Sequence, residues 1–355
     1  MNNFFESDID CNQKIQELRA EINANPEKVE PYILLGTTLA YNNYMDEAIE
    51  IFELLLENHP ENIQGLLNLG SAYFYVANNE KAVELYQKAI ELVPDNYTGY
   101  LNLANVFAEL GEFQRALELY NKALELNLGD SEIFSAIGLL YQDFGKYEEA
   151  YSYFKKANES LTGDYENHIN LASASMQLGR LDEAINCYKL ASEINNKDYK
   201  SLVCIGNALS EQNKFYEAYK YYEKAINIKA DFAKAYLCYG ISLSEAGDLD
   251  EAIKKYRKAA EIDESDSKIN IILANALVDK GEYAEAIEHY RVSLEKSPNN
   301  VVSYIALGHV FAMKGDIEEA VNFYRKASKI EPENEEISTI YIDALEEFLA
   351  RQDSF

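Results

Sequence analysis

The chain has 355 residues, of which 48% are apolar, and its net charge is −29 at pH 7. A field of this sign repels phosphates, so it argues against nucleic acid and anionic membranes as partners and favours a cationic or neutral one. The 16 Gly and 6 Pro are too few for many turns of mixed type, whereas 28 Tyr and no Trp suit repeated helices packed through aromatic side chains.

The first 28 residues form a separate N-terminal segment. Ile15, Leu18 and Ile22 precede Pro26 and share one helical face, which predicts a single, partial capping helix. The segment shows neither a basic n-region nor an apolar h-region, and no apolar run in the chain reaches the roughly 18 residues of a membrane span.

The cysteines show no CxxC pair and no metal-ligand spacing; they are Cys11, Cys187, Cys204 and Cys238. Reduced thiols are the simplest interpretation of this pattern. Together with the missing signal peptide, it predicts a cytoplasmic protein that does not insert into a membrane.

Residues 29–334 repeat every 34 residues without insertion or deletion. The nine repeats are 29–62, 63–96, 97–130, 131–164, 165–198, 199–232, 233–266, 267–300 and 301–334. In every repeat, position 8 is Gly or Ala, position 20 is Ala and position 24 is Phe or Tyr. Positions 4, 7, 8 and 11 fall on one helical face, and positions 20, 24 and 27 fall on another. Each repeat is therefore predicted to be a helix pair, helix A followed by helix B.

The turn between helix A and helix B of each repeat is predicted from the residue types at two positions. Position 15 is Gly or Asn in eight repeats, and both residue types tolerate the left-handed conformation that ends a helix. Position 19 is Glu in seven repeats, which places an acid in the first turn of helix B, where the helix dipole favours it. The small residues at positions 8 and 20 let the paired helices approach closely, and the aromatic at position 24 fills the space between hairpins.

Residues 335–355 are predicted to form a final amphipathic helix with a short tail. Its apolar face carries Ile337, Tyr341, Leu345 and Phe348. Ile342 stands where the repeats have the small residue of position 8, so no partner helix B is expected to pack there. The helix either closes the array or provides a surface for homo-oligomerisation.

These residues resemble the tetratricopeptide repeat (TPR) family over residues 29–334. The resemblance implies an all-α fold, a right-handed superhelix of antiparallel helix pairs. It also implies that helices A line the concave face through positions 2, 5, 6, 9, 12 and 13. The turn proline of the family at position 32 occurs only as Pro60, Pro94, Pro298 and Pro332. Residues 160–200, where His168 and Ser175 occupy usual core positions, are either a soft point or ordinary sequence drift.

The apolar residues of this candidate groove are Ile33, Leu67, Leu101 and Ile305 at position 5, joined by Tyr41, Phe74, Tyr75 and Met313. An apolar stripe of this length either docks a peptide or helix or is half buried between helices. Phe74 and Tyr75 favour docking.

Two sets of charged residues follow the same surface. An acidic row at position 13 comprises Glu109, Asp143, Glu211, Glu245 and Asp279. It either attracts Lys or Arg of a partner or reflects the general acidity of the chain. A basic ladder at position 2 comprises Lys200, Lys234 and Lys268, which either holds acids of a partner or pairs with Asp198, Asp231 and Asp266.

Polar residues complete the candidate site. They are Asn68, Asn102 and Asn170 at position 6, Asn105, Asn207 and Asn275 at position 9, and His309 at the groove. An asparagine ladder can hydrogen-bond an extended peptide backbone. This role is known for some relatives of the resembled family.

No catalytic, cofactor-binding or metal-binding motif is found, and the four histidines fall at four different repeat positions. The chain is therefore predicted to be a non-catalytic scaffold or adaptor without a cofactor, which binds a protein or peptide with basic and apolar residues. The alternatives are a self-assembling structural protein and a regulatory repeat subunit of a separate enzyme such as a glycosyltransferase.

Overall fold

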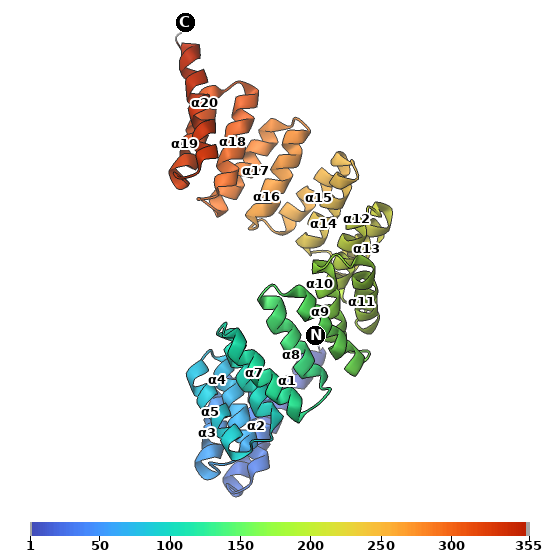
Figure 1. Ribbon diagram of the computed structural model, residues 1–355, viewed down its shortest axis with the longest axis vertical. Helices are drawn as coiled ribbons and strands as arrows, with labels where there is room; N and C mark the ends of the chain where they lie inside the picture. The colour runs from blue at the N-terminus through green and yellow to red at the C-terminus, as the bar shows by residue number, and fades with distance from the viewer. Residues whose placement is uncertain (1, 353–355) are drawn as a thin grey trace. The chain divides into compact units, whose positions relative to one another are not determined.

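The structure, a computed structural model, describes the backbone of residues 2–352 and the side chains of residues 12–350. Cys11 therefore lies outside the described side chains. The described backbone forms helices joined by short turns, without a strand, and the predicted all-α fold of stacked helix pairs is confirmed (Figure 1). The chain divides into two compact units, Met1–Leu178 and Gly179–Phe355.

The first unit contains α1 (Asn2–Ala24), α2 (Val29–Tyr41), α3 (Met45–Asn58), α4 (Ile63–Tyr75), α5 (Asn79–Leu92), α6 (Tyr97–Glu109), α7 (Phe113–Leu126), α8 (Ser131–Asp143), α9 (Tyr147–Ser160) and α10 (Tyr165–Gln177). The second contains α11 (Leu181–Ile194), α12 (Tyr199–Glu211), α13 (Phe215–Ile228), α14 (Ala233–Glu245), α15 (Leu249–Ile262), α16 (Ser267–Asp279), α17 (Tyr283–Lys296), α18 (Val301–Lys314), α19 (Ile317–Ile330) and α20 (Glu335–Gln352). From α2 to α18, every even-numbered helix begins at the first residue of a 34-residue repeat.

Most A helices begin with a side-chain cap at the last residue of the preceding repeat. The side chain of Asn62, for example, accepts a hydrogen bond from the Gly65 amide at 2.7 Å. Asp130, Asp198 and Asn300 cap α8, α12 and α18 in the same way. Each cap satisfies at least one amide that the first helical turn leaves without a partner, and Asp130 accepts from two.

The A helices end where the chain turns through the left-handed region. Gly111, Gly145 and Gly247 have φ values of 74°, 70° and 88° at position 15. Asn43 and Asn213 adopt the same conformation with φ of 63° and 59°. Ala77, the residue that breaks the Gly or Asn pattern, also has a positive φ, at 57°. The turn therefore imposes its conformation even on a residue whose Cβ disfavours it.

We expect Ala77→Gly to stabilise the chain by about 0.5–1 kcal/mol, because relief of the left-handed strain outweighs the added entropy of the unfolded glycine. Thermal or urea unfolding measures the difference. Gly111→Ala, which makes the opposite change at the equivalent position, is expected to destabilise. An unfolding midpoint that is lower for Ala77→Gly than for the wild type contradicts the backbone strain assigned to Ala77.

The core of each hairpin is a contact between the aromatic at position 24 and the small residue at position 8. A Cβ placed on Gly206 would lie 2.5 Å from Cε1 of Tyr222, and one on Gly70 would lie 2.6 Å from Cε1 of Tyr86. Tyr222 and Tyr86 are almost completely buried. The side chain of position 20 is fully buried in all nine repeats, as at Ala48. The helix pairs therefore pack at a distance that only small residues allow.

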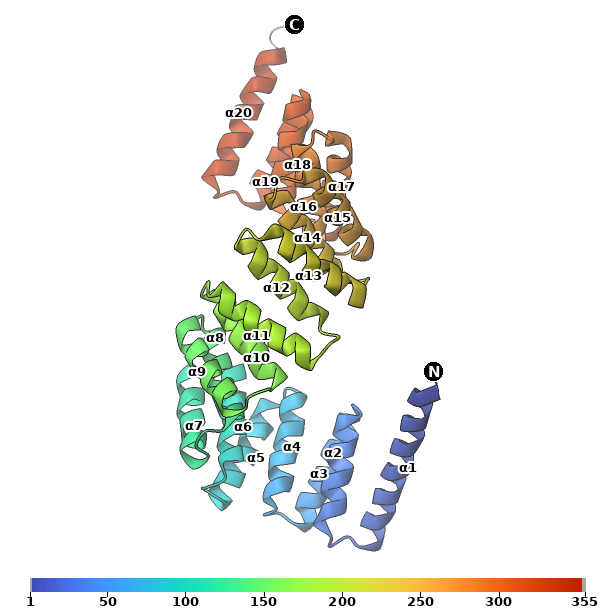
Figure 2. The same ribbon diagram turned by 90° about the vertical axis from the view of Figure 1, so that its right-hand side faces the viewer.

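Single helices cover the two ends of the array. In the first unit, α1 lies beside α2, and Leu18 and Ile22 are buried there (Figure 2). In the second unit, α20 packs on α19 and buries Ile337. Ile342 and Leu349 on α20 stay about half exposed, so this helix keeps an uncovered apolar strip.

The fifth repeat differs from the others in its core chemistry. His168 and Ser175 are buried, and neither the Nδ1 atom of His168 nor the hydroxyl of Ser175 has a hydrogen-bond partner. Burial lowers the pKa of His168, so the ring stays neutral near pH 7. The boundary between the two units, after Leu178, falls in the same repeat.

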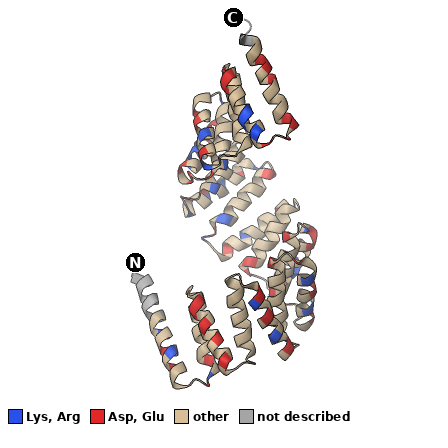
Figure 3. Ribbon diagram, turned by 90° about the vertical axis from the view of Figure 1, so that its left-hand side faces the viewer, with Lys and Arg blue, Asp and Glu red and all other residues tan. Residues whose placement is uncertain are grey.

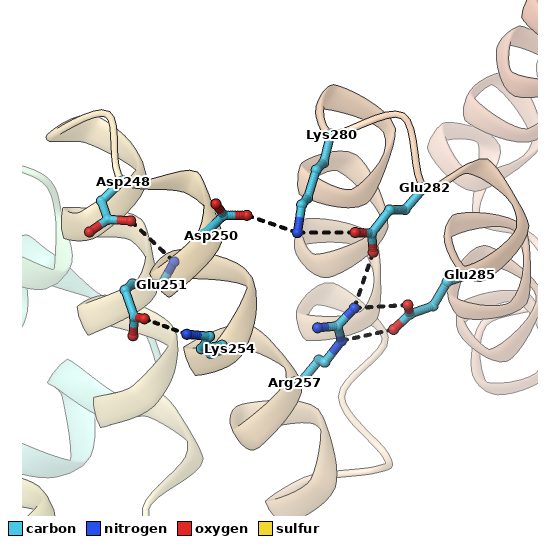
Figure 4. A network of polar contacts seen from close by, with 8 residues as sticks. All are labelled: Asp248, Asp250, Glu251, Lys254, Arg257, Lys280, Glu282 and Glu285. Atoms are coloured by element: carbon cyan, nitrogen blue, oxygen red, sulfur yellow. Dashed lines mark hydrogen bonds and ion pairs between the residues drawn. The ribbon is translucent and has the colours of Figure 1, made fainter.

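Acidic residues outnumber basic ones on the helices and turns (Figure 3), and several cations of the second unit are held in pairs (Figure 4). Arg257 on α15 donates from Nε and Nη2 to the two carboxylate oxygens of Glu285 on α17, at 2.9 and 2.8 Å. The ammonium of Lys280 lies 2.8 Å from Asp250 and 3.0 Å from Glu282. These pairs join the seventh repeat to the eighth, and the Arg257 guanidinium lowers the pKa of Glu285.

His289 lies beside this network on α17. Its Nδ1 is 2.9 Å from Oδ1 of Asn270, whose amide nitrogen donates to the Asp266 carbonyl at 3.3 Å. Because Oδ1 can only accept, Nδ1 carries the proton of the neutral ring. Burial lowers the pKa of His289, and although the nearby Glu285 raises it and Arg257 lowers it further, the net direction is downward.

Stability around His289 is expected to decline as the pH falls below 6.5, the ordinary value for His, because the unfolded chain then binds a proton that the folded ring resists. Hydrogen exchange of α16 and α17 from about pH 7.5 to about pH 5.5 measures this loss. His289→Gln, which can still donate to Asn270, is expected to flatten the local pH dependence. If hydrogen exchange depends on pH in the same way in the wild type and in His289→Gln, His289 is not the group that causes the loss of stability.

Candidate peptide-binding groove

Cavities between neighbouring A helices recur along the described residues, and the three described next use equivalent repeat positions. Each is lined by positions 9, 12, 13 and 24 of one repeat and by positions 6, 9, 10 and 13 of the next. Their volumes are about 430 Å³ between the first and second repeats, 370 Å³ between the sixth and seventh, and 260 Å³ between the eighth and ninth. One architecture therefore presents three pockets that differ only in side chains.

The pocket of the first two repeats, which we call the aromatic pocket, is mostly apolar. It is lined by Tyr41 and Tyr75 with Phe52, Met45 and Asn68. Tyr41 is 89% exposed and Tyr75 is 68% exposed. The amide nitrogen of Asn68 is buried without a hydrogen-bond partner. An apolar cavity with an unpaired donor inside it is typical of a binding site.

The sequence predicts that Phe74 and Tyr75 together dock a partner. Phe74 is only half exposed and packs against the core of the first unit. Tyr41, at position 13 like Tyr75, lines the aromatic pocket with it instead. Equal spacing of 34 residues, rather than adjacency in sequence, brings the two tyrosines to one cavity.

The pocket of the sixth and seventh repeats, which we call the hydroxyl pocket, is polar. Ser210 and Ser242 are buried, and Ser210 donates to the Ser242 hydroxyl at 2.7 Å and lies 3.3 Å from Glu245. Glu211 and Glu245 are exposed, and both line the pocket. The two serines stand where the aromatic pocket has Ala40 and Ala72.

The pocket of the eighth and ninth repeats, which we call the aliphatic pocket, is lined by Val278, Val310, Met313, Asp279 and His309 among others. Met313 is 60% exposed. His309 is exposed and contacts the edge of the Tyr324 ring at a centroid distance of 5.6 Å. Four of the predicted groove residues therefore meet in one place, Asn275, Asp279, His309 and Met313.

The asparagines of position 9 are already engaged inside the repeats. The hydroxyls of Tyr120, Tyr222 and Tyr290 donate to Oδ1 of Asn105, Asn207 and Asn275 at 2.6, 2.9 and 2.5 Å. In the second repeat, Ser71 takes the place of Asn and lies 3.0 Å from the Tyr86 hydroxyl. One lone pair of each Asn oxygen is therefore engaged inside its own repeat. The side chain of Asn207 also hydrogen-bonds that of Cys238 in the next repeat. Asn102 and Asn170 at position 6 are half-buried.

We expect Tyr222→Phe to lower the free energy of unfolding by about 1 kcal/mol, because it leaves Oδ1 of Asn207 without its hydrogen-bond donor. Tyr222→Ala, which empties the core, is expected to cost about 3–5 kcal/mol. Urea unfolding measures both.

The fourth repeat supplies a control, since it has Phe154 at position 24 and Leu139 at position 9. Tyr222→Phe/Asn207→Leu reproduces that pair and is expected to recover part of the loss. If Tyr222→Phe alone changes nothing, the hydrogen bond does not stabilise the repeat.

The interpretation of position 5 as an exposed apolar stripe is wrong for its strongest members. Ile33 and Leu101 are buried, and Leu67 and Ile305 are half-buried. These side chains lie between packed helices, which is the alternative that the sequence left open. Exposed apolar area on the groove comes instead from Tyr41, Tyr75 and Met313 at position 13.

The charged rows lie at opposite ends of the A helices. Glu109 and Asp143 in the first unit, and Glu211, Glu245 and Asp279 in the second, are exposed near the C-terminal ends. Lys200, Lys234 and Lys268 are exposed near the N-terminal ends. Eleven residues separate Lys234 from Glu245, which corresponds to about 16 Å along the helix.

The expected pairing of these lysines with local aspartates is not found. Among the described residues, none of the three ammonium groups forms an ion pair. Asp198 and Asp266 instead cap helices through backbone amides, and Asp231 lies 3.8 Å from Lys229.

Another cavity, of about 490 Å³, lies among Arg257, Glu261, Asn270, Glu285 and His289, away from the A-helix pockets. No sequence pattern points to this cavity, whose residues come mostly from the B helices α15 and α17 rather than from the groove positions. Its Arg257, Glu285, Asn270 and His289 are already bonded to one another. Within residues 12–350, no cluster of His, Cys, Asp and Glu could hold a metal ion. No described helix is long and apolar enough to cross a membrane.

The serines of the hydroxyl pocket were missed on the sequence. Their signal is a small residue at position 12 of one repeat and at position 10 of the next, as in Ser210 with Ser242 and Ala40 with Ala72.

Family models match most of the chain. Residues 56–265 match the model described as "Cilia and flagella-associated protein 70 C-terminal domain", residues 274–315 match a TPR repeat model, and residues 29–62 and 301–334 match a tetratricopeptide repeat model. None of the curated proteins matches the chain.

Solved structures that resemble the chain include three repeat proteins. The C-terminal part of a TPR repeat-containing protein from Cytophaga hutchinsonii is 16% identical, with a TM-score of 0.54, and the match covers 69% of this chain and 99% of that one. YrrB, described as a TPR protein with an unusual peptide-binding site, is 25% identical over 56% of this chain and 99% of its own, with a TM-score of 0.48. MamA is 27% identical over 50% of this chain and 96% of its own, with a TM-score of 0.46.

The helix pairs, the 34-residue period and the family matches agree. The chain belongs to the tetratricopeptide repeat proteins, with residues 56–265 in the family of the cilia and flagella-associated protein 70 C-terminal domain.

Proposed function

We propose that the chain is a non-catalytic scaffold that binds an extended segment of a partner protein on the A-helix surface, and that the aromatic pocket is its main anchor in the first unit. Tetratricopeptide repeat proteins are generally protein-binding scaffolds. The observation that carries the proposal is the apolar cavity between the exposed Tyr41 and Tyr75. Exposed aromatics beside a cavity are the residues that most often dominate binding energy.

The chemistry of the pocket selects the anchoring residue. Its lining is mostly apolar, which suits an aromatic or large aliphatic side chain of the partner. The amide nitrogen of Asn68 in the pocket wall is unpaired but buried, so it can donate to a backbone carbonyl of the partner only if the side chain turns toward the cavity. Beyond the pocket, the exposed Glu109 and Asp143 occupy the same position in the third and fourth repeats and favour basic residues.

We also propose that the protein works in the cytoplasm. The described cysteines, Cys187, Cys204 and Cys238, are free. Burial raises the pKa of Cys187 to about 11, which keeps its thiol protonated and unreactive near neutral pH. Free thiols in this number suit a reducing compartment.

A peptide-display selection on the full-length chain tests the anchor. Dodecamers selected from a randomised library are expected to carry an aromatic or large aliphatic residue. Their affinity is expected to fall about ten- to hundredfold for Tyr41→Ala/Tyr75→Ala, the loss that two anchoring aromatics account for. Fluorescence anisotropy with a labelled selected peptide measures the change.

Tyr216→Ala is the matched control, because Tyr216 is 85% exposed but lies on a B helix, α13. It is expected to leave the affinity unchanged. Equal binding by the double variant and the wild type rules out the aromatic pocket as the anchor.

Self-assembly is a second candidate, favoured by the half-exposed Ile342 and Leu349 on α20. Sedimentation at several concentrations separates the two functions, since a scaffold with a free groove needs no second copy. A dimer that Ile342→Ser/Leu349→Ser dissociates would support self-assembly.

A further inference from the structure

We propose that the A-helix surface of the sixth to ninth repeats recognises a two-residue pattern in its partner, a Lys or Arg side chain in the hydroxyl pocket and a Leu- or Met-like side chain in the aliphatic pocket, about six residues apart along an extended chain. This inference rests on the proposed function and specifies the partner of the second unit. It uses residues other than those of the aromatic pocket.

The hydroxyl pocket is suited to a cation. Its rim carries two carboxylates, Glu211 and Glu245, from position 13 of neighbouring repeats. Ser210 lies 3.3 Å from a carboxylate oxygen of Glu245, which holds that group toward the pocket. The lining contains no cationic side chain, so the two carboxylates have free acceptor capacity.

The interior of the pocket fits the polar end of a long side chain. Ser242 and Tyr222 are almost fully buried, yet both line the cavity. An apolar guest would leave these hydroxyl and carboxylate groups without water, at a free-energy cost. An ammonium or guanidinium donates to them instead, and its methylene stem can cover Ile241 at the rim. An acidic guest is repelled by Glu211 and Glu245.

The nearest cation of the basic ladder, Lys234, acts electrostatically on Cys238 in the pocket wall, but among the described residues it forms no ion pair with the two carboxylates. Lys234 lies on the same helix as Glu245 but about 16 Å away along its axis. The groove of these repeats therefore has an acidic edge and a basic edge, and the hydroxyl pocket opens at the acidic edge.

The aliphatic pocket has the same architecture but different contents. Val278 and Val310 stand where the hydroxyl pocket has Ser210 and Ser242, and Met313 stands in place of Glu245. Its volume of about 260 Å³ is the smallest of the three. An unbranched or γ-branched aliphatic side chain fits this lining better than an aromatic ring. Asp279 keeps one acid at its edge.

The distance between the pockets sets the spacing of the pattern. The two pockets are two repeats apart, and neighbouring packed helices lie roughly 10 Å from one another. The span is therefore about 20 Å, which an extended chain covers in about six residues.

A displayed library of randomised dodecamers on the full-length chain provides the test, with selection on the wild type and on Glu211→Lys/Glu245→Lys. The wild type is expected to enrich Lys or Arg about six residues from Leu or Met. The charge-reversed chain is expected to lose the basic residue and to enrich Asp or Glu at that place. Unchanged preference for a basic residue, or no spacing preference on the wild type, overturns the proposal.

Binding of one selected peptide gives the magnitude. Glu211→Gln/Glu245→Gln is expected to weaken it about tenfold at physiological salt, as two partly screened charge contacts would. Met313→Asp is expected to weaken the same peptide without changing the preference for a basic residue. Glu193→Gln/Glu217→Gln removes two exposed B-helix carboxylates and is the control for net charge, expected to have no effect. Equal losses for both pairs of Glu variants would show a general charge effect and overturn the pocket.

Tyr41→Ala/Tyr75→Ala in the same selection separates the two proposals. If it abolishes aromatic anchors while the basic and aliphatic pattern persists, both proposals stand. If the pattern is missing but the aromatic anchor remains sensitive to the tyrosines, only the inference for the second unit fails. If the tyrosine variants change nothing while the pattern depends on Glu211 and Glu245, only the aromatic anchor fails.

Discussion

The structure depends on one steric match, the aromatic ring of position 24 against the small residue of position 8. The Tyr222 ring lies so close to Gly206 that a Cβ there would stand 2.5 Å from it. This contact brings helix A and helix B of one repeat close together. The three pockets share one set of repeat positions, and their chemistry differs because the facing side chains differ, Ala40 and Ala72 in one, Ser210 and Ser242 in another, Val278 and Val310 in the third.

The sequence predicts the frame well because its main determinants are local and repeated. A Gly or Ala at position 8, an Ala at position 20 and an aromatic at position 24 recur in every repeat, and the helices begin where this period places them. Even Ala77, which stands where the other repeats have Gly or Asn, adopts the left-handed conformation of the turn. Helix periodicity and close packing leave few other arrangements.

The site was harder to predict, since exposure depends on contacts between repeats. Position 5 is apolar in nearly every repeat, yet Ile33 and Leu101 are buried and Leu67 and Ile305 are half-buried, so the position does not form a fully exposed stripe. The asparagines at position 9 accept hydrogen bonds from Tyr hydroxyls of their own repeats, so their presence in the sequence does not by itself indicate a ligand. Tyr41 and Tyr75 show what the sequence can reveal, because a shared repeat position placed them at one cavity. The buried serines became visible only when neighbouring helices were seen together.

The bond between positions 24 and 9 has a mechanical consequence. Tyr222 holds Asn207 inside its own repeat, while both residues line a cavity whose far wall belongs to the next repeat. A guest in that cavity touches both sides of a junction, and the stability of a solenoid is a sum over such junctions. Each bound side chain therefore stabilises the junction between the two repeats that it contacts. The junctions without a bound side chain keep their original flexibility.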